Sequence, residues 1–216
     1  MTVFKYKAFN ERRDKIFLSV IAVAIILYTA FSFTYFSASS QSVRADVVRL
    51  HILANSDSKK DQAVKLLVRD ALLNENTNLL SRGVTTDNAK EYFLENKEIL
   101  LATAKETLKK NNFDYDVSIS LGKEYFETRR YGELIFPAGE YTSLKVILGN
   151  GKGHNWWCVM FPPLCVPSAS DIETDESKTA DYLTHGGEKI VTGGNKYIIK
   201  FKILEIYEEL RNELLK

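Results

Sequence analysis

The chain has 216 residues, of which 29 are basic and 28 acidic, giving a net charge of +1 at pH 7. This near-neutral balance argues against binding to nucleic acid and against a polybasic surface for lipid headgroups. The two cysteines and three histidines are too few and too scattered to predict a metal site, and no motif predicts a cofactor.

The N-terminal region predicts a membrane segment. Residues 16–36 form an uncharged run, which as a helix spans about 31 Å and therefore crosses a bilayer. Basic residues dominate the preceding segment 1–15, so we expect it to stay in the cytoplasm and the rest of the chain to be exported. Two outcomes stay open: the run is retained as an anchor, or it is cleaved as a signal near Ser37–Ser40.

The next segment, 37–166, predicts one exported domain that opens with a strand and two helices. From Val48 to Ala54, apolar and polar residues alternate as in a half-buried strand. Ser58-x-x-Asp61 is typical of a capping box, and an apolar stripe at helical spacing follows it. Thr85 or Thr86 is the expected cap of a second helix.

Three strands follow, around 115–121, 124–135 and 141–148. The predicted fold is therefore α+β, with a mixed or antiparallel sheet covered by two helices. We expect residues 167–195 to form an acidic flexible loop and 196–216 a C-terminal amphipathic helix.

Residues 149–165 have the least usual composition in the chain. They hold both tryptophans, both cysteines and three of the four prolines, and they follow neither a helical nor a strand period. The glycines lack the context of a phosphate-binding loop. We expect a constrained irregular loop, pinned by a Cys158–Cys165 disulfide, in which at least one of Trp156 and Trp157 faces outward to bind a partner.

Two other functions are compatible with the same residues. A cell-wall or peptide hydrolase would use Cys158 as a nucleophile with His154 or His51 as its base, although a disulfide would remove the thiol. A glycan-binding module would use the indoles as platforms for sugars.

Three segments together resemble the stage II sporulation protein R family of endospore-forming bacteria. They are Arg49–Ser58 with its continuation through Asp61 and Gln62 to Val68–Ala71, then Phe136–Tyr141, then Gly151–Cys165. The resemblance covers about 46–165 and extends to the preceding hydrophobic segment, but not to the acidic loop or the closing helix.

The resemblance implies a messenger rather than an enzyme. Proteins of this family are made in the forespore and exported into the space between the two sporulation membranes. There they trigger a membrane-embedded aspartic protease of the mother cell, which processes the precursor of sigma factor E. On this basis, the residues expected to bind the partner are Arg49, His51, Asn55, Asp57, His154, Asn155, Trp156, Trp157 and Phe161.

Overall fold

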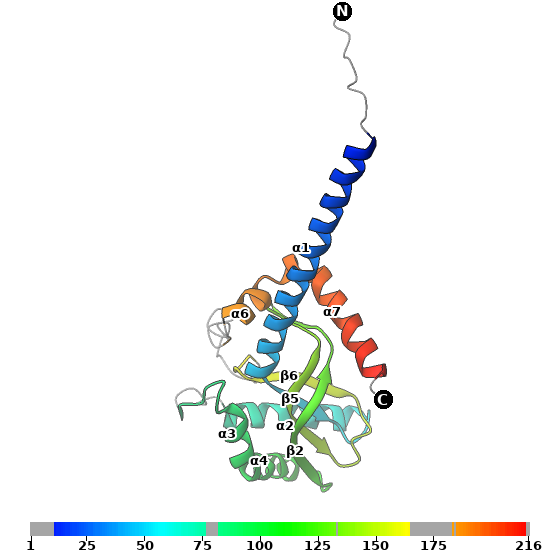
Figure 1. Ribbon diagram of the computed structural model, residues 1–216. Helices are drawn as coiled ribbons and strands as arrows, with labels where there is room; N and C mark the ends of the chain where they lie inside the picture. The colour runs from blue at the N-terminus through cyan, green and yellow to red at the C-terminus, as the bar shows by residue number, and fades with distance from the viewer. Residues whose placement is uncertain (1–10, 77–81, 133, 165–182, 184, 215–216) are drawn as a thin grey trace, which may run out of the picture. The chain divides into compact units, whose positions relative to one another are not determined.

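The computed structural model describes residues 11–76, 82–132, 134–164, 183 and 185–214 (Figure 1). The chain divides into two compact units, Met1–Ala38 and Ser39–Lys216. Helix α1 (Glu11–Asp46) begins in the first unit and ends in the second.

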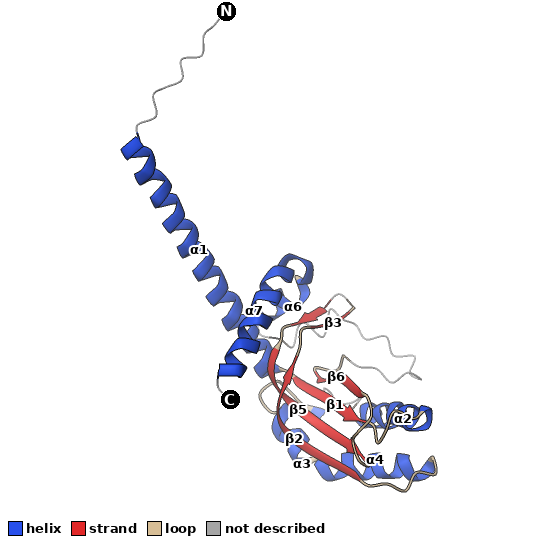
Figure 2. Cartoon of the chain, turned by 90° about the vertical axis from the view of Figure 1, so that its right-hand side faces the viewer, coloured by secondary structure: helices blue, strands red, loops and turns tan. Residues whose placement is uncertain are grey.

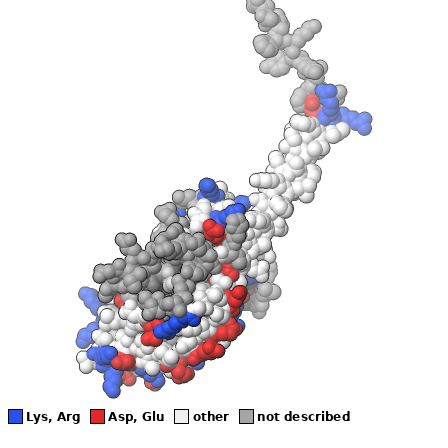
Figure 3. Space-filling view, turned by 90° about the vertical axis from the view of Figure 1, so that its left-hand side faces the viewer, with Lys and Arg blue, Asp and Glu red and all other residues white. Residues whose placement is uncertain are grey.

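The part of α1 in the first unit is long and apolar enough to cross a membrane. Its large apolar side chains, from Ile16 to Tyr35, are mostly exposed. Figure 3 shows charged atoms at the N-terminal end of this rod and none along the rest of its visible face. These properties fit either a membrane anchor or a signal segment.

The second unit is built on a four-stranded mixed sheet in the order β2-β5-β1-β6 (Figure 2). The central strand β1 (Val48–Leu53) pairs in parallel with β5 (Gly139–Leu148) and antiparallel with β6 (Asn155–Phe161). Strand β2 (Val117–Phe126) lies antiparallel to β5 at the other edge. Because side chains alternate along a strand, each position in β1 faces one of two distinct cores.

Helices α2 (Lys59–Glu75) and α4 (Lys97–Lys110) cover one face of the sheet, with the short helix α3 (Ala89–Glu95) beside α4. Leu50 and Ile52 of β1 point into this core, where they meet Val64, Val68 and Leu72 of α2. As expected, Ser58 caps α2: its hydroxyl accepts a hydrogen bond from the backbone N–H of Asp61 at 3.1 Å.

The other face carries a second core, made by Phe126, Tyr141 and Val159 from the sheet and by residues of neighbouring elements. These elements are the end of α1, the hairpin of β3 (Arg129–Tyr131) and β4 (Leu134–Phe136), and α6 (His185–Thr192). The last helix, α7 (Gly194–Leu214), buries Phe201 and Leu204.

The predicted α+β class, with a mixed sheet, an apolar N-terminal helix and a C-terminal helix, is confirmed. Three details differ. The single helix expected after Thr85 is two helices, α3 and α4, which meet at Asn96. The strand expected at 124–135 is divided among β2, β3 and β4. Residues 185–192 of the expected acidic loop form helix α6, while 167–182 lie outside the described residues.

Candidate functional site

Two segments that are far apart in sequence form one surface at the carboxyl end of β1. They are the turn after β1, residues 54–58, and the turn between β5 and β6, residues 149–154, called here the paired turns. The backbone N–H groups of Asn150 and Lys152 donate to the side chain and the carbonyl of Asn55, at 2.9 and 3.2 Å. The N–H of Gly153 donates to the carbonyl of Ala54 at 2.9 Å. Backbone hydrogen bonds therefore hold the two turns together.

Glycine is required where the paired turns touch. A Cβ added to Gly153 would lie 2.2 Å from the carbonyl oxygen of Ser56, and one added to Gly149 would lie 2.3 Å from Oδ1 of Asn55. Gly149 also has a φ of +54°, a conformation that side chains disfavour. The close approach of two backbones thus explains Gly153, whereas a positive φ and the nearby Asn55 side chain explain Gly149.

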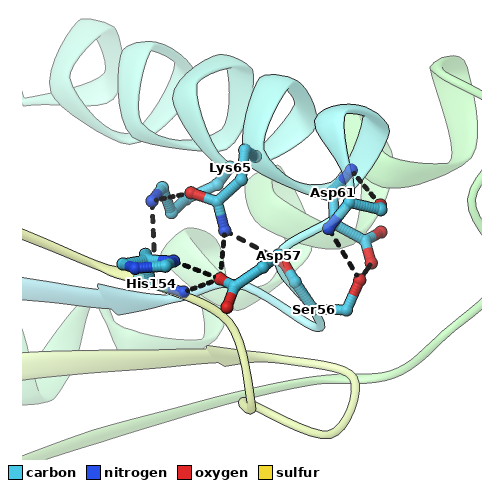
Figure 4. A network of polar contacts seen from close by, with 7 residues as sticks. Ser56, Asp57, Asp61, Lys65 and His154 are labelled. Atoms are coloured by element: carbon cyan, nitrogen blue, oxygen red, sulfur yellow. Dashed lines mark hydrogen bonds and ion pairs between the residues drawn. The ribbon is translucent and has the colours of Figure 1, made fainter.

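Asp57 and His154 face each other across the paired turns (Figure 4). The Asp57 carboxylate accepts from the backbone N–H of His154 at 2.6 Å and also contacts the Nδ1 of its ring. The hydrogen bond from that backbone N–H is the main reason that the pKa of Asp57 lies below its usual value. The side chains of His154 and Asp57 are 79% and 55% exposed, so both are available to a partner.

Two side chains of α2 hold this surface in place from the side of the helix. Lys65, which is only 4% exposed, donates to the carbonyl of His154 at 2.8 Å and to Gln62 at 2.6 Å. Asp61 accepts from Ser56 at 2.5 Å and from Asn55 at 3.0 Å. Burial raises the pKa of Asp61, but these hydrogen bonds outweigh burial and hold it below its ordinary value.

The two tryptophans lie in strand β6, so the expectation of an irregular loop is wrong for residues 155–161. Trp156 packs against the core under the helices, where the guanidinium of Arg69 lies 4.4 Å from its ring centroid. Trp157 lies on the opposite face of the sheet, stacked 3.6 Å from His51. Strand alternation sends the two indoles to opposite faces, and both are partly buried.

His51 belongs to a polar cluster on that second face. Its Nδ1 lies 3.2 Å from both carboxylate oxygens of Glu124, whose Oε1 also accepts from Lys145 at 2.6 Å. Burial is the main cause of the lowered pKa of His51, and Glu124 opposes it. This cluster joins the three strands β2, β5 and β1.

Two residues expected at the surface are buried. Phe161 is 0% exposed and belongs to the core under the helices. Arg49 is also 0% exposed, and its guanidinium lies among the rings of Phe126, Tyr131, Phe136 and Tyr141. Neither side chain reaches a partner in this conformation, whereas Asn155 is exposed beside His154.

No catalytic thiol geometry is seen among the described residues. Cys158 is buried and takes part in a disulfide, and its side chain lies on the face of the sheet opposite to His51. Cys165 lies outside the described residues, so the Cys158–Cys165 pairing stays a prediction. Within the described parts of the chain, no group of three His, Cys, Asp or Glu side chains has the arrangement of a metal site.

Sequence reasoning missed Lys65 and Tyr115, which support the paired turns, and it assigned Asp61 only to the cap of α2 and not to its hydrogen bonds with Ser56 and Asn55. Tyr115 donates its hydroxyl to Asp61 at 3.2 Å. One sequence signal could have indicated that Lys65 is buried: on a helix it lies beside Val64 and Val68, which belong to the apolar stripe.

A family model described as stage II sporulation protein R matches residues 44–171. Stage II sporulation protein R of Bacillus subtilis (strain 168) is 40% identical to the chain over 136 residues, or 62% of this chain. The match spans 61% of that relative's length. No solved structure matches.

Proposed function

This chain belongs to the stage II sporulation protein R family, and from that premise we propose that it activates a membrane-embedded aspartic protease of the mother cell. Its family supports a role in sporulation signalling. Activation of the protease would lead to cleavage of the precursor of sigma factor E. The chain itself would act as a binding partner and not as an enzyme.

One observation carries the proposed contact surface: the paired turns bring together two of the segments on which the family resemblance rests. One is the end of Arg49–Ser58, and the other is the start of Gly151–Cys165. The result is a hydrogen-bonded surface that exposes Asp57, His154 and Asn155. A surface that is already ordered loses little conformational entropy when a partner binds.

Export is the second part of the proposal. The uncharged run with its basic N-terminal flank supports delivery of the second unit across the forespore membrane, and the disulfide of Cys158 fits an oxidising compartment. The proposed site of action is the intermembrane space, with the N-terminal segment retained as an anchor or removed after export.

The test is a reconstituted assay of protease activation with surface variants. His154→Ala removes a side chain that is 79% exposed, so the fold should survive. If His154 is a contact hot spot, the loss of about 2 kcal/mol of binding lowers the apparent affinity for the protease roughly 30-fold. Thr103→Ala on α4 is the matched control. Unchanged activation by a folded His154→Ala protein would exclude His154 as a major contact.

A double Trp156→Ala and Trp157→Ala variant is less informative. Both indoles pack against a core, so loss of signalling by this variant would not separate binding from folding. Co-purification with the protease should therefore compare the wild type with His154→Ala and Asn155→Ala.

The alternative of a Cys–His hydrolase is tested by titrating thiols in the native, unreduced protein. The disulfide of Cys158 predicts that this residue does not react. A reactive Cys158 together with peptide or cell-wall cleavage would favour the hydrolase and contradict the proposed signalling role.

A further inference from the structure

Helix α7 has apolar residues on two sides, and only one side is used by the fold. Phe201 and Leu204 are buried against the rest of the second unit, at 3% and 0% exposure. A second row is exposed and repeats at intervals of four, three and four residues, which places it on one face of the helix. It consists of Ile199 at 75%, Ile203 at 48%, Ile206 at 47% and Leu210 at 55%.

Charge is divided unequally along the same helix. Its N-terminal half contains Lys196, Lys200 and Lys202 and no acidic residue, whereas its C-terminal half contains four glutamates and Arg211. Lys196 and Lys202 are exposed beside Ile198 and Ile199, and Lys202, 66% exposed, also forms a surface ion pair with Glu205 at 3.3 Å. An exposed pair of this kind contributes little, so Lys202 can exchange Glu205 for a headgroup. Although the whole chain is nearly neutral, the N-terminal half of α7 has a basic and apolar surface. This combination is typical of helices that lie at the interface of anionic membranes.

The chain keeps this surface close to the predicted membrane segment. Arg44, near the end of α1, forms an ion pair with Glu208 of α7 at 3.6 Å. Arg44 lies eight positions after Phe36, the last residue of the uncharged run, and this part of α1 is helical, so it spans about 12 Å. Ile199 lies nine residues before Glu208, or about 14 Å along α7, so the chain tethers the N-terminal half of α7 near the end of the predicted membrane segment.

From these observations, we propose that the N-terminal half of α7 docks on the anionic lipid surface of the membrane that holds α1. Ile198, Ile199 and Ile203 enter the interface, and Lys196 and Lys202 pair with lipid headgroups. The inference rests on one of the two outcomes in the proposed function, the retention of α1 as a membrane anchor, and it is independent of the protease.

The test measures the depth of spin labels in the full-length chain reconstituted in nanodiscs. Single nitroxide labels are placed through Ile199→Cys or Ile203→Cys on α7, with Ala102→Cys on α4 as an aqueous reference. Ile25→Cys in α1 reports whether the anchor itself is embedded. In nanodiscs that contain phosphatidylglycerol, labels at 199 and 203 should collide with oxygen more than with a water-soluble nickel complex, whereas the label at 102 should not.

The charge dependence is tested with Lys196→Gln combined with Lys202→Gln. Because each lysine near an anionic surface contributes about a fivefold factor, the ratio of docked to undocked helix should fall roughly 30-fold. The control combines Lys105→Gln with Lys109→Gln, two exposed residues of α4, and should leave the ratio unchanged.

Three results would overturn the proposal. If the label at 25 is embedded but those at 199 and 203 remain aqueous, α1 is a membrane anchor but α7 does not dock on the bilayer. If the label at 25 is also aqueous, membrane attachment and docking both fail. If labels at 199 broaden one another's spectra, a second copy of the chain covers the face in place of lipid.

Discussion

Replacement of Gly153 by alanine tests whether the paired turns are as tightly joined as the structure indicates. The added Cβ would lie 2.2 Å from the carbonyl oxygen of Ser56 and 2.5 Å from its carbonyl carbon. Ordinary contact begins at 3.4 Å, so the two backbones must separate by about 1.2 Å. That separation would break the hydrogen bonds from Gly153 to Ala54, at 2.9 Å, and from the His154 N–H to Asp57, at 2.6 Å.

The cost follows from these contacts. Two hydrogen bonds contribute about 1 kcal/mol each, and overpacking adds about 1 kcal/mol or more, so the free energy of unfolding should fall by about 3 kcal/mol. For a domain of this size, that loss lowers the Tm by roughly 6–12 °C. The measurement is thermal unfolding of the full chain in detergent, followed by circular dichroism.

Gly122→Ala is the matched control, because a Cβ at Gly122 meets nothing within 4 Å. We expect its Tm to stay the same or rise slightly, since alanine loses less conformational entropy than glycine. If Gly153→Ala and Gly122→Ala have the same Tm, the close approach of the two turns does not constrain the fold, and the proposed rigid surface loses its basis.

Three further substitutions test the buried charges. Arg49→Met removes a buried guanidinium whose Nε and Nη1 have no hydrogen-bond partner among the described residues, and it also removes the 3.0 Å hydrogen bond from Nη2 to the Tyr131 hydroxyl. We expect the first effect to offset the second, so the Tm should stay the same or rise, and a loss above about 2 kcal/mol would contradict this. Lys65→Met leaves the His154 carbonyl without its hydrogen bond, so the free energy of unfolding measured in urea should fall by about 1–2 kcal/mol. An unchanged urea midpoint would show that Lys65 does not stabilise the paired turns. Burial lowers the pKa of His51 from 6.5, so the unfolded chain takes up the proton first and stability falls as pH drops below about 6.5. In His51→Gln, the free energy of unfolding should depend less on pH between about 7.5 and 5.5 than in the wild type. An equal pH dependence in both proteins would show that His51 is not the group responsible.

The sequence predicted elements whose signals are local. The Ser58 cap, the strand from Val48 and the uncharged run at 16–36 each depend on neighbouring residues, and the structure contains all three. The expectation that the strand is only half-buried is wrong, because β1 packs against a core on both faces: Arg49 and His51 are 0% and 4% exposed. The same reasoning failed for Trp156 and Trp157. Strand β6 packs against a different core on each face, so its consecutive residues are apolar and do not alternate with polar ones. The glycines just before β6 also made its first residue hard to predict.

The candidate site was only partly predictable, because burial of a charged side chain depends on its distant neighbours. Leu67 fits the apolar stripe of α2 but is 45% exposed, whereas Lys65 and Arg69 are 4% and 5% exposed. Lys65 is buried because it reaches the carbonyl of His154, and Arg69 because it lies over Trp156. His154 and Trp156 lie almost ninety positions after Lys65 and Arg69, so no local pattern reveals these contacts.

The pairing of β1 has a consequence for the timing of folding. Its parallel partner β5 and its antiparallel partner β6 both come late in the chain: Val48 lies opposite Thr142 and Phe161. Contacts this distant form slowly, and β1, the first strand to be synthesised, has no neighbouring strand until β5 has been made. If the second unit is exported as proposed, its four-stranded sheet can be completed only after β6 has crossed the membrane.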